Sequence, residues 1–143
     1  MLKRLFDIVA SLLGIIILLP CFLVICLTMA ISSGLPLFYM QTRVGKNNKD
    51  FKLLKFRTMH LDADKKGLLT VGGRDPRVTN IGYYLRKHKL DELPQLFNVL
   101  FGTMSLVGPR PEVRKYVDLY TKEQHQVLSV KPGITDFASL EYI

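Results

Sequence analysis

The longest apolar run of the chain lies near its N-terminus. Residues 8–31 contain no charged side chain, and at about 1.5 Å rise per residue such a run can cross the hydrocarbon core of a bilayer as one helix. Pro20 stands in the middle of the run, where a proline removes a backbone hydrogen bond and collides with the preceding turn. The pattern therefore predicts a membrane helix that Pro20 breaks into two halves.

Basic residues flank this apolar run on both sides. Lys3 and Arg4 precede it, and the segment 43–57 follows it with six basic side chains against one acidic side chain, Asp50. The cytoplasmic flanks of membrane helices are enriched in Lys and Arg, so we expect both flanks in the cytoplasm. A helix that enters the bilayer, turns at Pro20 and returns to the same face satisfies both flanks, whereas a straight span does not.

A secretory signal peptide is the alternative for this N-terminus. A basic start, an apolar run and the small residues within 30–33 resemble one. The length of the apolar run and the presence of Asp7 at its edge favour the membrane helix instead. Asp7 lies about one helical turn after Lys3 and Arg4, so we expect it to pair with one of these cations on one helical face.

Two segments after the apolar run, 34–41 and 51–57, are expected to be extended, and 45–48 reads as the turn between them. A small β-hairpin would result. Side chains two residues apart in a strand project from the same face, so Lys55 and Arg57 are predicted to form a local cationic surface. The alternative is that this basic face is merely solvated beside lipid head groups.

Three later segments carry apolar side chains at helical spacing. Thr79 or Asn80 can cap the first segment, Asp91 can cap the second, and Pro111 is a favourable first residue for the third. Gly102 is the predicted end of the second helix. The three apolar stripes are Ile81, Tyr84, Leu85 and His88; Leu93, Leu96, Phe97 and Leu100; and Val113, Tyr116, Val117 and Tyr120.

Together these elements predict a mainly helical α+β fold. Residues 1–33 would form the re-entrant membrane helix, and residues 34–143 would form a domain with a small hairpin and amphipathic helices at the membrane surface. The segment 130–135 predicts a turn, and the polar stretch after the hairpin predicts a loop. Asp62 and Asp64 in that stretch could be read as a metal-binding pair, but two acids in a polar loop are usually solvated.

Composition narrows the partners of the chain. Its 143 residues suit one domain with a modest core, and 20 Lys and Arg against 12 Asp and Glu give a net charge of +8. This excess favours anionic partners such as phospholipid head groups, nucleotide phosphates or nucleic acid. Nucleic acid is the least favoured, because no nucleic-acid-binding motif is present. Cys21 and Cys26 lie inside the apolar run and fit neither a disulfide framework nor a metal-ligand pattern.

The candidate chemistry lies between residues 86 and 112. Asp91 and Glu92 are adjacent carboxylates at a predicted helix start, Arg86 precedes them, and Arg110 is held between two prolines, which restrict its backbone. From spacing alone, Asp91 can be a simple helix cap and Glu92 a first-turn acid. Two arginines near two carboxylates also suit a phosphate site that supplies its own acid or nucleophile.

Several motifs resemble those of the bacterial sugar transferase family, the monotopic phosphoglycosyl transferases that begin the assembly of surface glycans. The resemblance covers the chain from about residue 1 to its end. It is carried by Lys-Phe-Arg-Thr-Met at 55–59, Asp-Pro-Arg-Val-Thr at 75–79, Ile81-Gly82 with Leu85-Arg86, Leu-Asp-Glu-Leu-Pro-Gln at 90–95, and Ser-Leu-Val-Gly-Pro-Arg-Pro at 105–111. The last two form a specific pair, and they favour the phosphate site over the simple helix cap.

The resemblance implies an enzyme that transfers a phosphosugar from a UDP-sugar to polyprenyl (undecaprenyl) phosphate, with release of UMP, on the cytoplasmic face of the bacterial inner membrane. It makes Asp91 the nucleophile and a contact of Mg²⁺, and Glu92 its partner carboxylate. Arg86 and Arg110 would hold phosphate oxygens, with Lys55 adding charge and Arg57 as a further candidate. Membrane lipid is an expected partner, and nucleic acid is not.

Two departures from the family pattern keep alternatives open. The family usually has Ser-Pro at the break of the membrane helix, where this chain has Leu19-Pro20. Family members also normally continue for several tens of residues beyond the point that corresponds to Ile143. A truncated and inactive family member, or a membrane-anchored basic module that only binds partners, are therefore the rival interpretations.

Overall fold

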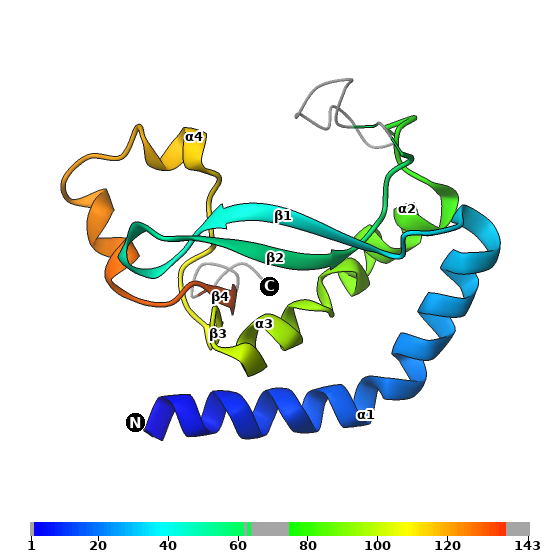
Figure 1. Ribbon diagram of the computed structural model, residues 1–143, viewed down its shortest axis with the longest axis horizontal. Helices are drawn as coiled ribbons and strands as arrows, with labels where there is room; N and C mark the ends of the chain where they lie inside the picture. The colour runs from blue at the N-terminus through cyan, green and yellow to red at the C-terminus, as the bar shows by residue number, and fades with distance from the viewer. Residues whose placement is uncertain (1, 62, 64–74, 137–143) are drawn as a thin grey trace.

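One long helix forms the base of the molecule. The computed structural model describes residues 2–61, 63 and 75–136, and its first element is helix α1, Leu2–Ser33. Figure 1 shows that α1 bends between two arms, and the second arm turns up beside the rest of the fold. Pro20 lies inside this helix, and its missing N–H is a physical cause of such a bend. Because α1 is one continuous helix from Leu2 to Ser33, two separate half-helices do not form.

The predicted hairpin is confirmed. Strands β1, Phe38–Val44, and β2, Asp50–Phe56, pair antiparallel from Phe38 opposite Phe56 to Val44 opposite Asp50. A short 3₁₀ turn, η1 (Lys46–Asn48), connects them. Asn47 and Asn48 have φ of 58° and 60°, the left-handed region that asparagine tolerates better than most residues.

The helices beneath the hairpin follow the sequence signals in part. Helix α2, Asn80–Lys87, begins as predicted, because Thr79 Oγ1 accepts the Gly82 N–H at 3.0 Å. The helix start expected at Asp91 is wrong. Residues Leu90–Glu92 form a 3₁₀ turn, η3, and helix α3 is Gln95–Phe101 with Pro94 before its first residue. Gly102 ends α3 with φ 90°, as predicted.

A small parallel sheet closes the far end of α3. Strand β3, Ser105–Val107, pairs with β4, Gly133–Thr135. The segment 130–135, predicted as a turn, therefore ends in a strand. Its partner lies far away in the sequence, so no local pattern marks it. The backbones cross so closely at Gly108 and Gly133 that a Cβ on either residue would overlap the other backbone.

The amphipathic helix predicted after Pro111 is much shorter than expected. Helix α4 is only Arg114–Val117. Beyond its end, the Thr121 N–H donates to Gln124 Oε1 at 2.8 Å and the Gln124 N–H donates to Thr121 Oγ1 at 3.3 Å. This reciprocal pair has the hydrogen bonds of a capping box, and it closes the turn just before the 3₁₀ segment η4, Gln124–Ser129.

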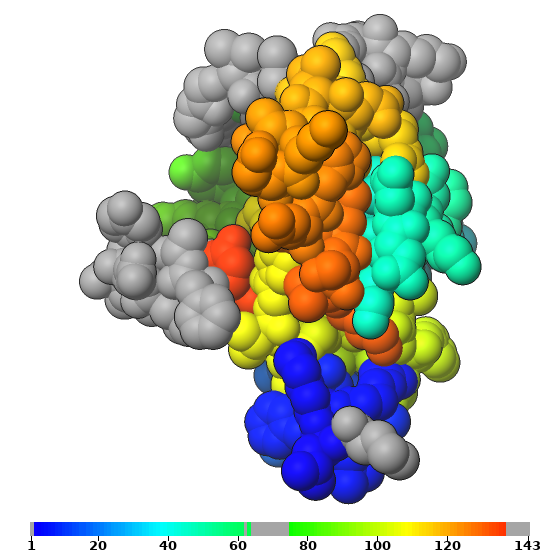
Figure 2. All heavy atoms as spheres, turned by 90° about the vertical axis from the view of Figure 1, so that its left-hand side faces the viewer, coloured from blue at the N-terminus to red at the C-terminus, as the bar shows by residue number. Residues whose placement is uncertain are grey.

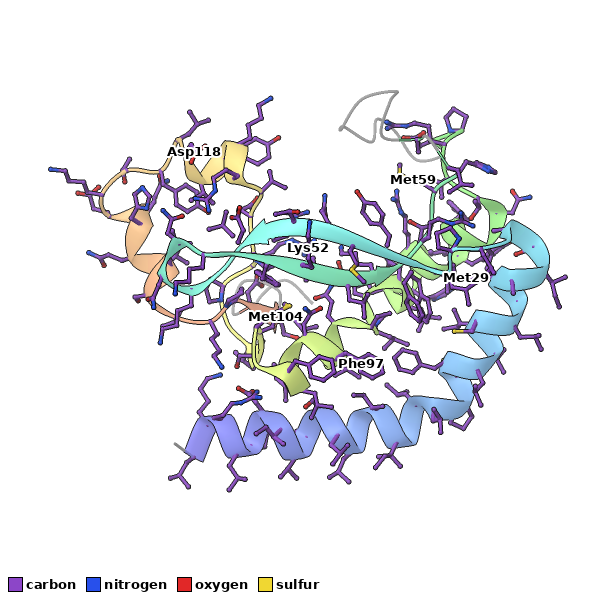
Figure 3. The ribbon with its side chains drawn as sticks, viewed as in Figure 1. Met29, Lys52, Met59, Phe97, Met104 and Asp118 are labelled. Carbon is purple, nitrogen blue, oxygen red and sulfur yellow. The ribbon has the colours of Figure 1, made fainter. Side chains whose placement is uncertain are left out.

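The main core joins the second arm of α1 to the hairpin and to α2. Its buried members are Phe22, Ile25, Met29, Phe56 and Leu85. The ring of Phe22 lies 5.7 Å from that of Phe56 and 5.9 Å from that of Phe97. Figure 3 shows Phe97 on the side of α3 that faces α1. Each such side chain contributes about 1.5–3 kcal/mol when fully buried, so this cluster holds α1 against the domain.

Polar contacts attach the N-terminal end of α1 to the same domain. Asp7 is buried and accepts hydrogen bonds from Ser105 Oγ at 2.9 Å and from the Leu106 N–H at 3.1 Å. Its predicted ion pair forms with Lys3, at 3.7 Å. Arg4 donates to the carbonyl oxygens of Val99 and Leu100 at 2.6 and 2.7 Å, and a cation there suits the negative end of α3.

The C-terminal end of α1 is held in the same manner. Arg57 is buried, and its guanidinium donates to the carbonyl oxygens of Ser33 and Gly34, both at 2.7 Å, and of Leu35 at 3.3 Å. These carbonyls have no partner within the helix. Arg57 therefore satisfies the end of α1 and fixes the exit of the chain toward β1.

Much of the remaining surface of α1 is apolar and exposed. By length and composition α1 is the one helix among the described residues that could cross a membrane. The side chains of Leu2, Phe6, Ile17 and Ile31 are 85%, 65%, 73% and 80% exposed. Soluble proteins rarely expose a contiguous apolar surface of this kind to water. Contact with lipid would account for it.

Candidate active site

The turn that carries the two carboxylates rests on the core. Lys89 begins it in the left-handed conformation, with φ 55°, which reverses the chain sharply after α2. Leu90 and Leu93, on either side of the carboxylates, pack against the core that contains α1. Asp91 and Glu92 are both partly buried between these two leucines. A rigid support of this kind suits a catalytic group, because its position does not depend on a loose loop.

Cations from two distant segments reach Glu92. Lys55 Nζ lies 2.7 Å from Glu92 Oε1, with 17% and 23% of the two side chains exposed, and Arg110 Nη2 lies 3.7 Å from the same oxygen, with 63% of the Arg110 side chain exposed. Asp91 forms no ion pair with any residue that the structure describes. Of the two carboxylates, Asp91 is thus the one left available for chemistry.

The pKa values of the two neighbouring carboxyl groups shift in opposite directions. Burial raises the pKa of Asp91 above its ordinary value of 3.8, and the charge of Glu92 raises it further, against the opposing pull of Lys55 and Arg86. Burial alone would also raise the pKa of Glu92. The hydrogen bond and charge of Lys55, with Arg110 and Lys89, outweigh burial and bring that pKa below 4.5. Adjacent acids with diverging pKa values often mark a functional site.

Arg86 reaches the site from α2 and is held by a threonine. Its Nε donates to Thr58 Oγ1 at 2.8 Å, and its charge acts on Asp91. Thr58 is buried, and its carbonyl accepts the Thr79 N–H at 3.0 Å, just before α2 begins. Gly82 makes this close packing possible, because a Cβ there would overlap the Thr58 carbonyl. The end of the hairpin therefore fixes where Arg86 points.

The proline turn that carries Arg110 is fastened from both sides. On one side, the Gly108 N–H donates to the Thr135 carbonyl at 3.0 Å and the Gly133 N–H to the Pro109 carbonyl at 2.9 Å. On the other side, Arg43 Nη1 donates to the Pro111 carbonyl at 3.0 Å. Arg110 thus has a rigid backbone and an exposed side chain, the combination that lowers the entropy lost on binding an anion.

An amide on α3 aligns the hairpin with this site. Asn98 Nδ2 donates to the Lys52 carbonyl at 2.8 Å, and its Oδ1 accepts the Leu54 N–H at 2.9 Å. Asn98 in this way satisfies the open edge of β2, which would otherwise present unpaired backbone groups. Because Lys55 follows directly, the same contact sets the distance between its ammonium group and the η3 turn.

Four of the residues predicted for phosphate or proton chemistry come together here with Asp91. They are Glu92, Lys55, Arg86 and Arg110. Arg57 does not join them. The expectation that Lys55 and Arg57 share a strand face is wrong, because β2 ends at Phe56 and the next side chain turns to the end of α1 instead.

Sequence reasoning missed the supporting residues Thr58, Asn98 and Arg43. Thr58 lies inside the motif at 55–59, so its place beside two expected site residues was the available signal. Nothing local marks Asn98 or Arg43, because their partners are backbone carbonyls of distant segments.

The donor set fits a magnesium ion that is shared with a substrate. Among the described residues no group of three or more His, Cys, Asp or Glu could hold a metal alone. Mg²⁺ does not need such a group, because it is commonly bound by one or two carboxylates together with substrate phosphates and waters. Asp91 is the carboxylate of this site that forms no ion pair with a described residue, and it could supply such a ligand. The candidate metal-binding pair Asp62 and Asp64 lies outside the described residues.

Comparison with known proteins identifies the class. The site consists of two carboxylates on the η3 turn, with Lys55, Arg86 and Arg110 around them. The family model described as "Bacterial sugar transferase" matches residues 1–143. The chain belongs to the bacterial sugar transferase family, and by family it is a transferase.

Three curated relatives illustrate the likeness. The uncharacterized sugar transferase EpsL of Bacillus subtilis is 48% identical over 97% of this chain and 68% of its own length. The UDP-N-acetylgalactosamine-undecaprenyl-phosphate N-acetylgalactosaminephosphotransferase of Aeromonas hydrophila is 40% identical over 96% of this chain and 33% of its own length. The UDP-glucose:undecaprenyl-phosphate glucose-1-phosphate transferase of Escherichia coli is 41% identical over 98% and 31%. The chain spans about one third of the last two.

The opposite pKa shifts predict opposite effects on stability. Folded Asp91 holds its proton more tightly than the unfolded chain does, so its contribution to stability is present below pH 3.8 and is lost as pH rises through the raised pKa. Glu92 contributes stability above pH 4.5 that is lost as pH falls through its lowered pKa. At pH 7, Asp91→Asn should therefore raise Tm and Glu92→Gln should lower it.

Thermal unfolding of both variants and the wild type across pH checks this. The difference in Tm between the two variants should be largest near neutral pH, and it should shrink at low pH, where both carboxyl groups of the wild type are protonated. Destabilisation by Asp91→Asn at pH 7 would show that burial does not dominate at this carboxylate.

Proposed function

We propose that this protein transfers a sugar 1-phosphate from a UDP-sugar to polyprenyl phosphate, through a covalent intermediate on Asp91. Family membership supports the class of reaction, and the names of the relatives from Aeromonas hydrophila and Escherichia coli include both the nucleotide sugar and undecaprenyl phosphate. The observation that carries the proposal is the arrangement at η3. One partly buried carboxylate is free, its neighbour is neutralised by Lys55 and Arg110, and Arg86 lies close.

The first step forms the covalent intermediate. A carboxylate oxygen of Asp91 attacks the phosphorus that bears the sugar, the Asp–O–P bond forms, and the bond from that phosphorus to the oxygen bridging the two phosphates breaks. UMP leaves with the electron pair of that bond. In the second step a phosphate oxygen of the polyprenyl phosphate attacks the same phosphorus and releases the Asp91 carboxylate, so the enzyme is regenerated. Dividing the transfer in this way is ordinary nucleophilic catalysis by a carboxylate.

Charge is the main obstacle that the site must overcome. The nucleophile, the donor and the acceptor are all anions, so cations must offset their repulsion in the transition state. Arg110, with an exposed side chain on a rigid turn, and Arg86, held by Thr58, would bind phosphate oxygens. Lys55 keeps Glu92 neutralised beside Asp91. Asp91 would also contact Mg²⁺, which when bound neutralises charge on the donor phosphates.

The attachment of both ends of α1 to the domain supports a re-entrant arrangement of this helix in the membrane. Arg4 and Asp7, at one end of α1, bind α3 and β3, while Arg57 binds the other end. A helix that crossed the bilayer would carry one of these ends away from the domain and break its contacts. A bent helix that enters and leaves on the cytoplasmic side keeps both. The polyprenyl phosphate would then reach the site from the lipid beside α1.

Two rivals explain parts of the structure. A membrane-anchored binding module accounts for the charge and the apolar helix but not for the free carboxylate among cations. An inactive family member would keep the site but lack turnover. Catalysis by this chain separates the proposal from both rivals.

Turnover is the direct test. The chain in detergent, with UDP-sugars, undecaprenyl phosphate and Mg²⁺, should release UMP, measured by a coupled luminescence assay. Asp91→Asn should lose about 10³-fold or more in kcat, because loss of a nucleophile removes the whole covalent route. Lys115→Gln, on exposed α4, is the control and should keep its rate. Full activity of Asp91→Asn would exclude the mechanism, and an inactive wild-type chain would favour the inactive family member.

Topology can be tested separately by cysteine labelling. Cys21→Ala and Cys26→Ala remove the native thiols, and Leu2→Cys or Lys49→Cys then reports each flank of α1. In intact cells an impermeant maleimide should label neither position, and after permeabilisation it should label both. Labelling of residue 2 alone from outside would indicate a spanning helix in place of the re-entrant one.

A further inference from the structure

Cations from three separate segments gather at the N-terminal end of α1. Lys3 and Arg4 belong to α1, Lys46 to the hairpin turn η1, and Lys131 to the loop before β4. A Cβ built on Gly102 would lie 3.0 Å from Arg4 Nη2 and 3.5 Å from Lys131 Nζ, so these two cations meet above the end of α3. In Figure 2 the blue start of α1, the cyan hairpin turn and the orange segment that leads to β4 meet on one face.

The charges in this cluster are poorly balanced. Burial lowers the pKa of Lys131, and Arg4, Lys46 and Lys3 lower it further, while Asp7 acts in the opposite direction. Asp7 is already occupied by Ser105, Leu106 and Lys3. A surface with excess positive charge of this kind attracts an anion.

Two of the four cations have no side-chain hydrogen-bond or ion-pair partner in the described part of the chain. Lys3 donates to Ser105 and to the Val107 carbonyl, and Arg4 donates to the end of α3. Lys46 and Lys131, in contrast, form no side-chain hydrogen bond or ion pair with another described residue. Their ammonium groups therefore remain available to an outside partner.

Exposed apolar side chains adjoin these cations. Leu2, Leu5 and Phe6, on the same turns of α1 as Lys3 and Arg4, are 85%, 60% and 65% exposed, and Phe101, next to Gly102, is 77% exposed. Apolar side chains beside basic ones are characteristic of segments that bind a membrane surface with anionic lipids. The site is also separate from the carboxylates, because none of its four cations is among the charges that shift the pKa of Asp91 or Glu92.

We propose that Lys46 and Lys131, supported by Lys3 and Arg4, bind the phosphate of an anionic phospholipid head group whose chains lie against the exposed N-terminal arm of α1. This proposal rests on the membrane association that the proposed function includes, and it adds a preference for anionic lipid. Bound there, the lipid would join the hairpin turn, the loop before β4 and α1, the three segments that meet at this end of the fold.

Lipid-dependent thermal unfolding of the whole chain tests the proposal. In neutral detergent micelles, added phosphatidylglycerol should raise Tm in a saturable manner, and phosphatidylcholine should raise it far less. Each lysine near an anionic membrane surface is worth about fivefold in binding. Lys46→Gln/Lys131→Gln should therefore need roughly 25-fold more phosphatidylglycerol for the same shift. Lys115→Gln/Lys122→Gln removes the same charge from exposed positions and should behave as wild type.

Three outcomes would overturn the site. An equal shift with phosphatidylcholine would assign the effect to the apolar helix alone, and an equal shift with inorganic phosphate would indicate a free-anion site. An unchanged response of Lys46→Gln/Lys131→Gln would exclude these lysines. Repeating the titration on Asp91→Asn separates this proposal from the catalytic one, since the lipid shift should persist without turnover.

Discussion

Attachment of both ends of α1 to one folded domain is the constraint on which the rest of the structure depends. Arg4 and Asp7 bind backbone groups of α3 and β3 at one end, and Arg57 binds the last carbonyls of the helix at the other. Between these ends, α1 contributes Phe22, Ile25 and Met29 to the core that supports the η3 turn. The apolar helix is thus part of the scaffold, and the two carboxylates are held at a fixed distance from the exposed face of that helix.

Within that scaffold, adjacent acids take different roles because of their neighbours. Lys55 and Arg110 neutralise Glu92, while Asp91 keeps a raised pKa through burial. An ionised and partly desolvated carboxylate without a close partner is costly to keep, and such costs are typical of functional groups. The cations that would offset the substrate phosphates come from β2, α2 and the proline turn. The Glu92 carboxylate holds Lys55, the Thr58 hydroxyl holds Arg86, and backbone hydrogen bonds fasten the turn that carries Arg110.

Local patterns predicted those features whose causes are local. The hairpin, the Thr79 cap and the end of α3 at Gly102 follow from turn and cap chemistry. The set Asp91, Glu92, Lys55, Arg86 and Arg110 followed from motifs, and the structure brings its members together. The pairing of β3 with β4 and the support by Asn98 did not, because their partners are distant in the sequence.

The wrong predictions have equally specific causes. The helix expected from Asp91 begins later, after a 3₁₀ turn that Lys89 starts in a left-handed conformation. The helix after Pro111 ends already at Val117, and Thr121 and Gln124 then exchange hydrogen bonds ahead of a separate 3₁₀ segment. Arg57 was expected beside Lys55, but β2 ends between them, and the end of α1 offers its guanidinium three carbonyl oxygens.

The nucleophile is the central claim, and trapping it is the most direct measurement. The protein is incubated with a UDP-sugar and Mg²⁺ in the absence of polyprenyl phosphate, quenched rapidly in acid, digested and examined by mass spectrometry. A phosphosugar added to the peptide that contains Asp91, and absent from Asp91→Asn, is the predicted result. Turnover by protein that never carries this adduct, with kinetics that require both substrates bound together, would contradict the account.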